Sequence, residues 1–276
     1  MKLWDYHTHT SLCNHATGTI EDYVKAAVEV KLAEVGISDH FPMDLLPEHF
    51  HIYAMTLNDF PNYIDEIKRL KLKYNQIQIR ISSEVDYFPE VFDGYKKLLT
   101  PYLDDFDYII GSIHAIPWKN HDAIPVDELQ AVPLIRELGV DQFYLEYYNN
   151  LLRMVKTNFY DVVGHLDLPK KYGLVPYDTD RIWQKVLQLL DQIESNDLTV
   201  EINTSGLKKR IKQEYPSEDI IKELITRKIP ITLGSDAHSP QAIGFRFEEL
   251  ITKTKKWGLT EICQYSKRER SLVPLK

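Results

Sequence analysis

Short apolar runs alternate with longer amphipathic runs along the whole chain, and this alternation restricts the possible folds more than any other feature. It predicts strands at residues 2–7, 37–39, 77–85, 108–114, 161–165, 199–203, 230–234 and 261–265. It predicts helices at residues 20–35, 58–74, 90–102, 140–158, 180–194, 218–227 and 247–257, and a long loop at residues 117–133. Strands that alternate with helices form a parallel sheet covered by helices, so the expected class is α/β.

The length of the chain selects among folds of this class. At 276 residues we expect a single domain over residues 1–276. A closed TIM-like (β/α) barrel is favoured because such barrels take about 250 residues. A doubly wound open sheet is the structural alternative.

Composition argues against several classes of function. The formal net charge is −8, from 33 Lys and Arg against 41 Asp and Glu, and an acidic surface repels nucleic acid and anionic membranes. No run approaches the roughly 20 apolar residues that span a bilayer, and the N-terminus does not resemble a signal peptide. The two cysteines, Cys13 and Cys263, cannot form a disulfide framework. We therefore expect a cytoplasmic protein without nucleic-acid or membrane partners, and its oligomeric state stays open.

Imidazoles and carboxylates gather at the carboxyl ends of the predicted strands. These residues are His7, His9, Asp39, His40, Glu84, His114, His165, Asp236 and His238. In a parallel barrel the carboxyl ends of the strands meet on one face, where the site of such barrels lies. Chance would scatter the same residue types over helices and loops as well.

The spacing within two of these groups favours a metal site. Side chains alternate across a strand, so His7 and His9 point the same way, and Asp236 and His238 repeat the spacing. Mixed imidazole and carboxylate ligands suit Zn²⁺, Mn²⁺ or Fe²⁺ better than Ca²⁺ or Mg²⁺. The set is too large for one tetrahedral zinc ion. We therefore expect at least two divalent ions, with a carboxylate such as Glu84 or Asp236 as a bridge.

Three nearby residues are each open to two interpretations. The position of His15 alone does not decide between a ligand and a structural residue. Asp39 is open to a second interpretation, as a carboxylate that orients a ligating imidazole. Cys13 is more readily interpreted as a packed small residue than as a thiolate ligand.

Seven segments carry most of these residues and form a recognisable set. They are DYHTHTSLCNHATGTIEDYVKAA, GISDHFP, SSEVDYFP, GSIH, GHLDLPKKYG, EINTSGL and GSDAH. This set resembles the polymerase and histidinol phosphatase (PHP) superfamily, and the resemblance runs from the first strand to about Gly244. HTHTSLCNHA, GHLDL and EINTSGL resemble one branch in particular, the monofunctional histidinol-phosphate phosphatases.

The resemblance implies a distorted (β/α)7 barrel that holds up to three ions through nine ligands. The first ion would take His7, His9, Glu84 and Asp236. The second would share Glu84 and add His114 and His165, and the third would take His15, His40 and His238. All nine positions carry ligand types here. Ser82-Ser83 stands where relatives often have glycine, which affects backbone shape rather than ligation.

The resemblance also implies a metal-dependent phosphomonoesterase. The expected reaction converts L-histidinol phosphate and water into L-histidinol and phosphate, in L-histidine biosynthesis, by attack of a metal-bridging hydroxide on phosphorus. The two or three ions, with Asp236 among their ligands, would neutralise charge in the transition state. No protein nucleophile is needed.

Other residues are expected to complete the reaction. The leaving alkoxide needs a proton or a cation, and Asp39 with His40 is one candidate pair. The phosphate needs a cationic clamp, for which arginine has suitable geometry. The candidates are Arg153, Lys170, Lys171, Arg210 and Arg246. Ser205 follows a strand and is a candidate for a hydrogen bond to the substrate.

Four other functions stay open at this point. Another PHP phosphoesterase acting on small nucleotide or sugar phosphates would use the same metals with a different pocket. A nuclease or proofreading module agrees poorly with the acidic charge. A metal-dependent amidohydrolase also begins with His-x-His, but its usual pattern lacks the Glu84 position. A non-enzymatic metal protein would leave its ions no open coordination position.

Overall fold

The computed structural model describes residues 2–118 and 121–275. Its helices are α1 (Ile20–Glu29), α2 (Phe60–Lys73), α3 (Phe92–Leu99), α4 (Val132–Leu138), α5 (Val140–Lys156), α6 (Thr179–Ser195), α7 (Glu218–Arg227) and α8 (Phe247–Lys255). Its strands are β1 (Trp4–Asp5), β2 (Glu34–Ile37), β3 (Gln78–Ile81), β4 (Glu84–Asp86), β5 (Ile110–Ser112), β6 (Ala115–Trp118), β7 (His121–Pro125), β8 (Val162–Val163), β9 (Thr199–Asn203), β10 (Ile231–Gly234), β11 (Glu261–Ser266) and β12 (Glu269–Pro274).

A ring of parallel strands forms the centre of the molecule. One sheet has the order β1-β2-β3 and a second has the order β10-β9-β8-β5-β4, with parallel pairing throughout. Single bridges join the two sheets, Thr8 to Ala237 on one side and His40 to Glu84 on the other. With β3 and β4 counted as one interrupted strand, the ring has seven positions. This agrees with the predicted distorted barrel.

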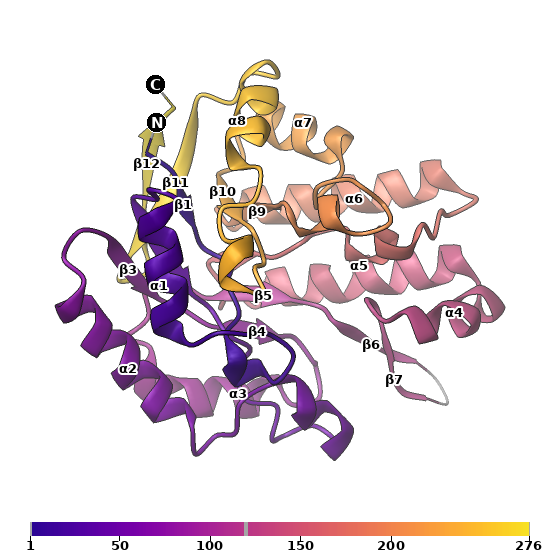
Figure 1. Cartoon of the computed structure of the whole chain (residues 1–276). Helices are drawn as coiled ribbons and strands as arrows, with labels where there is room; N and C mark the ends of the chain where they lie inside the picture. Colours follow the sequence, from indigo (N-terminus) through magenta and orange to yellow (C-terminus); the bar gives the residue numbers. More distant parts are fainter. Residues whose placement is uncertain (1, 119–120, 276) are drawn as a thin grey trace.

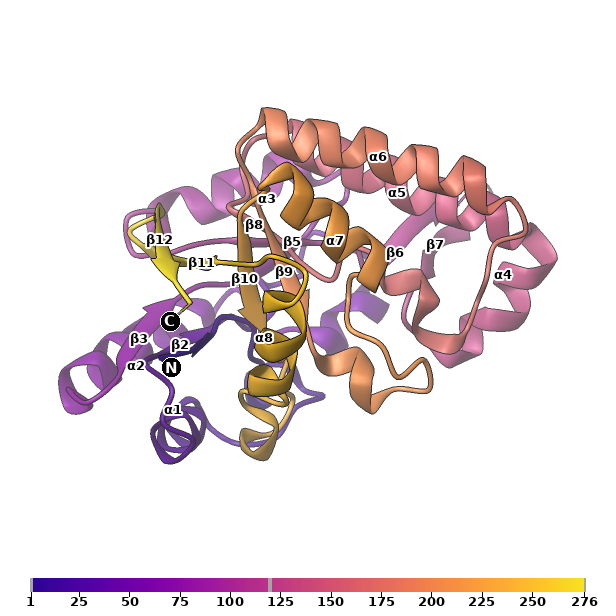
Figure 2. The same cartoon turned by 90° about the horizontal axis from the view of Figure 1, so that it is seen from above.

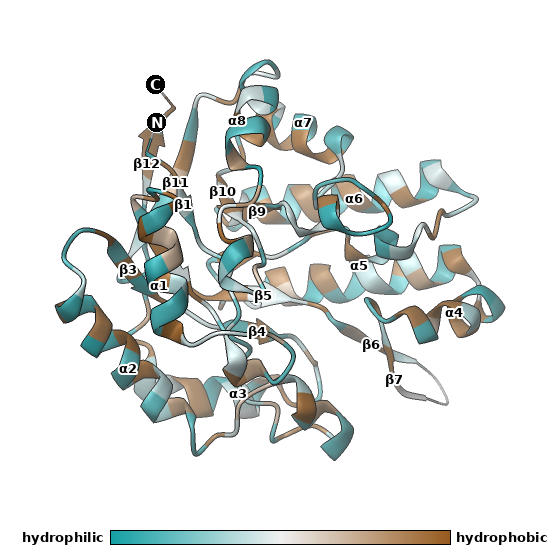
Figure 3. Cartoon of the chain, in the orientation of Figure 1, coloured by the Kyte–Doolittle hydropathy of each residue, from teal (hydrophilic) through white to brown (hydrophobic). Residues whose placement is uncertain are grey.

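Amphipathic helices lie around the outside of the ring (Figure 1, Figure 2). α1 begins at a capping box, in which Thr19 Oγ1 accepts a hydrogen bond from the Asp22 N–H and Asp22 accepts one from the Thr19 N–H. Such a cap contributes about 1 kcal/mol. Hydrophobic and hydrophilic residues alternate along α5 and α6, as expected for helices with one buried face (Figure 3). Among the helices of the described segments, none is long and apolar enough to cross a membrane.

Most predicted elements differ from the observed ones by a few residues at their ends, and the strand predicted at 37–39 lies earlier, at β2. Two of these differences have clear local reasons. The helix predicted at 20–35 ends at Glu29, because Lys31 adopts a left-handed φ of 60° and the residues after it form β2. The strand predicted at 77–85 breaks between β3 and β4. At the break, Tyr63 Oη donates to the Ser82 carbonyl and Ser83 Oγ donates to the Asp39 carbonyl. These side-chain hydroxyls bond to the backbone beside the remaining strand-to-strand hydrogen bonds, such as that from the Ser82 N–H to the Ile37 carbonyl.

The loop predicted at 117–133 is largely ordered secondary structure. β6 and β7 form an antiparallel hairpin, and α4 follows with Pro133 in its first turn. The prolines that suggested a loop occupy a short two-stranded hairpin and a helix start, both of which tolerate proline. The segment after β7 does reach the functional end of the barrel, as described below.

The chain ends in a hairpin of which only β11 was predicted. β11 and β12 pair along their full lengths and pack against the amino ends of the barrel strands. Trp4 Nε1 donates to the Cys263 carbonyl at 2.7 Å, and Tyr265 Oη lies 2.6 Å from Thr199 Oγ1. The hairpin therefore covers the end of the barrel opposite the carboxyl ends of the strands, and both chain termini lie beside it (Figure 1).

Candidate metal centre

The carboxyl ends of the barrel strands carry all nine predicted ligands to one end of the ring. The bridge between β1 and β10 places His7 and His9 beside Asp236 and His238. The bridge between β2 and β4 joins His40 directly to Glu84. The remaining members are His15 after β1, His114 after β5 and His165 after β8. Backbone pairing thus determines which ligand types become neighbours.

Glu84 occupies the centre of this cluster. Its Oε2 lies 3.2 Å from His7 Nε2, 3.3 Å from His9 Nε2 and 3.2 Å from His40 Nδ1. Its Oε1 lies 3.0 Å from His165 Nε2. A carboxylate surrounded by imidazoles has the arrangement expected of a ligand that bridges two cations.

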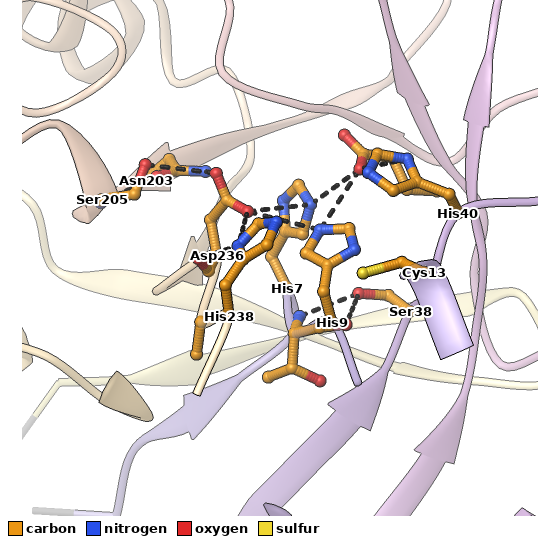
Figure 4. Close-up of polar contacts among 12 residues, drawn as sticks. His7, His9, Cys13, Ser38, His40, Asn203, Ser205, Asp236 and His238 are labelled. Atoms are coloured by element: carbon orange, nitrogen blue, oxygen red, sulfur yellow. Dashed lines mark hydrogen bonds and ion pairs between the residues drawn. The ribbon is translucent and has the colours of Figure 1, made fainter. Parts of the chain in front are cut away.

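Asp236 lies on the other side of His9 (Figure 4). Its Oδ1 is 3.3 Å from His9 Nε2 and 3.5 Å from His238 Nδ1. Its Oδ2 accepts hydrogen bonds from Ser205 Oγ at 3.2 Å and Asn203 Nδ2 at 3.4 Å. Asp236 also adopts a φ of 49°, a conformation that costs free energy in residues other than glycine and is concentrated at functional sites. The hydrogen bonds to Oδ2 leave Oδ1 directed at the imidazoles.

The donor atoms of the cluster fit divalent cations. Several buried atoms have no hydrogen-bond partner among the described residues: His7 Nε2, His9 Nδ1, His9 Nε2, His40 Nδ1, Glu84 Oε2 and His165 Nδ1. An unpaired buried polar atom costs about 1–3 kcal/mol, and such atoms are rare in folded proteins. The donor atoms of His9, His40 and His238 lie within 4.8 Å of one another. A cation among these lone pairs would satisfy them.

Burial and nearby charges favour the metal-ligating protonation state at His9, His40, Glu84 and Asp236. At His7 and His114 the neighbouring carboxylates outweigh burial and raise the pKa of the imidazole, well above its usual value at His7 and to about 10 at His114. Burial, and then the charge of His238, lowers the pKa of His9 to about 3. Burial also lowers the pKa of His40 well below its usual value. Burial by itself would raise the pKa of Glu84 and of Asp236, but the imidazoles around them hold both well below the ordinary range. Neutral imidazole and ionised carboxylate are the forms that ligate metals.

Two buried carboxylates that were not predicted from the sequence contact the predicted ligands. Glu201 Oε1 lies 2.7 Å from His7 Nδ1, and its Oε2 accepts a hydrogen bond from the His165 N–H at 3.0 Å. Asp86 Oδ1 lies 3.0 Å from His114 Nδ1. Carboxylates in this position fix the ring orientation of ligating imidazoles. Each lies two residues from another polar residue of its strand, and this same-face spacing was the available signal.

Glu201→Gln is expected to lower metal affinity by roughly 10- to 100-fold, the usual cost of removing such a supporting group. Both oxygens of Glu201 face nitrogen atoms, so an amide would turn an N–H toward a donor. Zinc titration against a chromophoric chelator measures the affinity, and a thermal melt checks the fold. Glu194→Gln on the exposed face of α6 is the matched control. Wild-type affinity in Glu201→Gln would show that the carboxylate does not support the ligands.

A cavity of about 870 Å³ opens over the cluster. Eight of the nine predicted ligands line it, and His7 lies fully buried beneath. Ser205 is in the cavity wall, where the sequence placed it. One side of the cavity is apolar, with Met43, Phe50 and Phe88 from a separate small core cluster.

Three of the predicted phosphate contacts do not reach this cavity, and those predictions are corrected. Arg153 lies on the exposed face of α5 because the apolar residues of that helix take the buried face. Arg246 is exposed and pairs with Glu249. Lys170 turns inward, where its Nζ lies 2.8 Å from Asp167 Oδ2.

Other lysine side chains line the cavity wall instead. Lys171, the other lysine of its segment, lines the cavity and lies 2.8 Å from Asp127 Oδ2. Lys208 and Lys209 also line it, whereas Arg210 is exposed outside the wall. Adjacent positions after a strand point in different directions, so the sequence alone did not separate Lys170 from Lys171.

Asp39 is not placed to assist a leaving group, which corrects its predicted catalytic role. Its two oxygens accept hydrogen bonds from the Thr10 N–H at 2.7 Å and from Thr10 Oγ1 at 2.8 Å. It lies outside the cavity wall, and burial raises its pKa to about 7. Because Thr10 follows His9 directly, these contacts agree with the alternative role of an orienting carboxylate. His40, its predicted partner, does line the cavity.

The sequence and this arrangement are similar to known proteins. The PHP domain family matches residues 5–205. A Deinococcus radiodurans protein named "Probable histidinol-phosphatase" is 33% identical over 258 residues, which cover 93% of this chain and 94% of that protein. The histidinol-phosphatase of Bacillus subtilis is 30% identical over 270 residues, covering 92% of this chain and 100% of the relative.

A solved structure has the same fold. The histidinol phosphate phosphatase of Lactococcus lactis, crystallised with zinc, L-histidinol and phosphate, matches with a TM-score of 0.78. The match covers 98% of this chain and 99% of the Lactococcus chain at 21% sequence identity. The distorted barrel is thus shared across a wide sequence distance.

Proposed function

Because this chain belongs to the PHP domain family, and within it to the histidinol-phosphatases, we propose that it hydrolyses L-histidinol phosphate to L-histidinol and phosphate. It is a metal-dependent phosphomonoesterase, and one domain over residues 1–276 carries the activity. The observation that carries the proposal is the convergence of nine imidazole and carboxylate side chains, several with unpaired buried donor atoms, at one end of the barrel, where eight of them line one cavity. The names of the relatives place the reaction in L-histidine biosynthesis.

The nine side chains divide among the metal ions as the family pattern suggests. His7, His9, Glu84 and Asp236 would hold the first ion. Glu84, His114 and His165 would hold the second, and His15, His40 and His238 the third. Imidazoles with carboxylates suit zinc, manganese or iron, and zinc is the ion bound by the Lactococcus enzyme. The central position of Glu84 supports its role as the shared ligand.

The protein side chains hold the reacting groups in place. Divalent cations bound here supply Lewis acidity and an activated water for the hydrolysis of a phosphate ester. Glu201 and Asp86 keep their imidazoles in one orientation, and Ser205 fixes Asp236. The positive charges of Lys208 and Lys209 in the cavity wall would attract the phosphate dianion, whereas Lys171 is paired with Asp127.

Phosphate release from a panel of esters tests the function. Metal-replete protein is expected to prefer L-histidinol phosphate over nucleotides and sugar phosphates, with activity lost to a chelator and restored by zinc or manganese. A preference for another ester would keep the metal chemistry and exclude this substrate. Turnover of no ester would favour an amidohydrolase or a metal-binding role.

The cellular setting is a further part of the proposal. The cavity volume of about 870 Å³ agrees with a small-molecule substrate. A cytoplasmic location, expected from the cysteine content, stays a prediction, as does the expected lack of nucleic-acid and membrane partners.

A further inference from the structure

Two carboxylates follow β7 and line the cavity, and their charges are balanced differently. Asp127 Oδ2 lies 2.8 Å from Lys171 Nζ, so a lysine compensates its charge. Glu128 Oε1 accepts a hydrogen bond from Tyr53 Oη, and its Oε2 accepts one from Gln130 Nε2 at 2.6 Å. Both partners that the described residues offer Glu128 are neutral. Its half-buried carboxylate therefore presents negative charge to the cavity.

Glu128 lies one aromatic ring away from the candidate metal centre. Tyr53, its partner, ends the 3-10 helix Glu48–Tyr53 and also lines the cavity. The Tyr53 ring packs edge-on against the His15 ring, with 6.0 Å between the ring centroids. Glu128 is thus beyond Tyr53 as seen from His15, on a cavity that also contains the apolar side chains of Phe50 and Phe88. One cavity therefore joins the cluster of ligands to a carboxylate beside an apolar wall.

The substrate has two chemically different ends. A phosphomonoester places its dianion at the cations of the metal centre, and the alcohol part extends into the rest of the cavity. L-histidinol carries an ammonium group and an imidazole, so its alcohol part is cationic and partly apolar. The cavity wall that contains Glu128, Phe50 and Phe88 is negatively charged and partly apolar. It is therefore complementary to this alcohol.

We propose that Glu128 binds the cationic nitrogen of the substrate and thereby selects phosphomonoesters whose alcohol carries a positive charge. This inference rests on the proposed function, and it assigns the selection to one side chain. Tyr53 and Gln130 are neutral hydrogen-bond partners of the Glu128 carboxylate, so they leave its charge uncompensated.

Glu128→Gln tests the proposal with the metal-loaded enzyme. The amide keeps the shape of the side chain and an acceptor for Tyr53, and it removes the charge. A charge-assisted hydrogen bond is stronger than a neutral one by enough to change affinity roughly 10- to 100-fold. We expect kcat/KM for L-histidinol phosphate to fall by that factor, mainly through KM. Turnover of p-nitrophenyl phosphate, which has no cation, and metal content should stay within about twofold of wild type.

Two control variants separate charge from structure. Tyr53→Phe removes the hydrogen bond and leaves the carboxylate, so it should keep most of the substrate preference. Glu137→Gln makes the same chemical change on the exposed face of α4 and should be neutral. Loss of preference in Tyr53→Phe equal to that in Glu128→Gln would overturn the proposal, because Glu128 would then act only by holding Tyr53.

The outcomes also separate this inference from the proposed function. Wild-type enzyme that prefers L-histidinol phosphate, together with an unchanged preference in Glu128→Gln, would overturn the inference alone. Wild-type enzyme that prefers an uncharged ester would overturn the proposed function, and the inference with it.

Discussion

Glu84→Gln is expected to lose most of its bound metal and to release phosphate from L-histidinol phosphate roughly 1,000-fold more slowly, or worse. Glu84 lies 3.0–3.3 Å from the nitrogens of four imidazoles, so a neutral amide would leave those ligands without their shared anion. Bound cations contribute several kcal/mol of transition-state stabilisation, and each 1.36 kcal/mol is about a factor of ten in rate. Elemental analysis of purified protein and a phosphate assay measure the two effects.

Controls show whether the loss belongs to the metal centre. Glu66→Gln makes the same change on the surface of α2, where the carboxylate pairs with Arg69, and should behave as wild type. His9→Ala and Asp236→Ala should lose metal as Glu84→Gln does while the fold survives, as followed by circular dichroism. Full metal content with full activity in Glu84→Gln would exclude Glu84 as the shared ligand.

Gly234→Ala is expected to damage the fold and the metal centre together. A Cβ at this position would lie 1.7 Å from Glu201 Oε1 and 2.7 Å from His7 Cβ. Neither neighbour can move without disturbing the contact between Glu201 and His7. Overpacking of this kind costs about 1–3 kcal/mol, with a fall in Tm of about 2–4 °C for each kcal/mol. We also expect metal affinity to fall at least about tenfold, because His7 loses its supporting carboxylate.

Gly94→Ala is the matched substitution. Its new Cβ would meet Leu45 Cδ1 at 2.6 Å, the far end of a flexible side chain, and α3 favours alanine over glycine. Metal affinity should therefore stay at the wild-type value, as measured by the same chelator competition. If Gly234→Ala bound zinc as tightly as wild type, the close approach of Glu201 to His7 would not matter for ligation.

The barrel and the convergence of the ligands were predictable because they depend on the periodicity of each segment and on the order of the segments along the chain. The bounds expected for 199–203 and 218–227 coincide with β9 and α7, since each has one clear periodicity and a sharp boundary. Residues at the carboxyl ends of parallel strands must meet whatever the details of packing. This is why Asp236 and His238 were found beside His7 and His9.

The supporting side chains were harder to predict because their partners lie far away in the sequence. Glu201 is 194 positions from His7 in the sequence. The residues around Glu201 do not indicate that its side chain contacts His7. The phosphate contacts failed for a related reason. Whether Arg153 or Lys170 reaches the cavity depends on the exact phase of α5 and of the turn after β8, which periodicity gives only approximately. β12 was missed because its edge-strand residues alternate weakly between apolar and polar.

The C-terminal hairpin has a consequence for traffic through the enzyme. Tyr265 of β11 packs against the stacked rings of Tyr6 and Tyr108, and Trp4 Nε1 donates a hydrogen bond to the hairpin backbone at Cys263. These buried side chains fill the amino-terminal end of the barrel. We therefore expect small molecules to enter and leave the cavity on the side of the carboxyl ends of the strands. With the metal ligands at the base of this cavity, we expect the substrate to enter with its phosphate end first. We also expect the alcohol product, which would lie farther from the metal ions, to leave before inorganic phosphate.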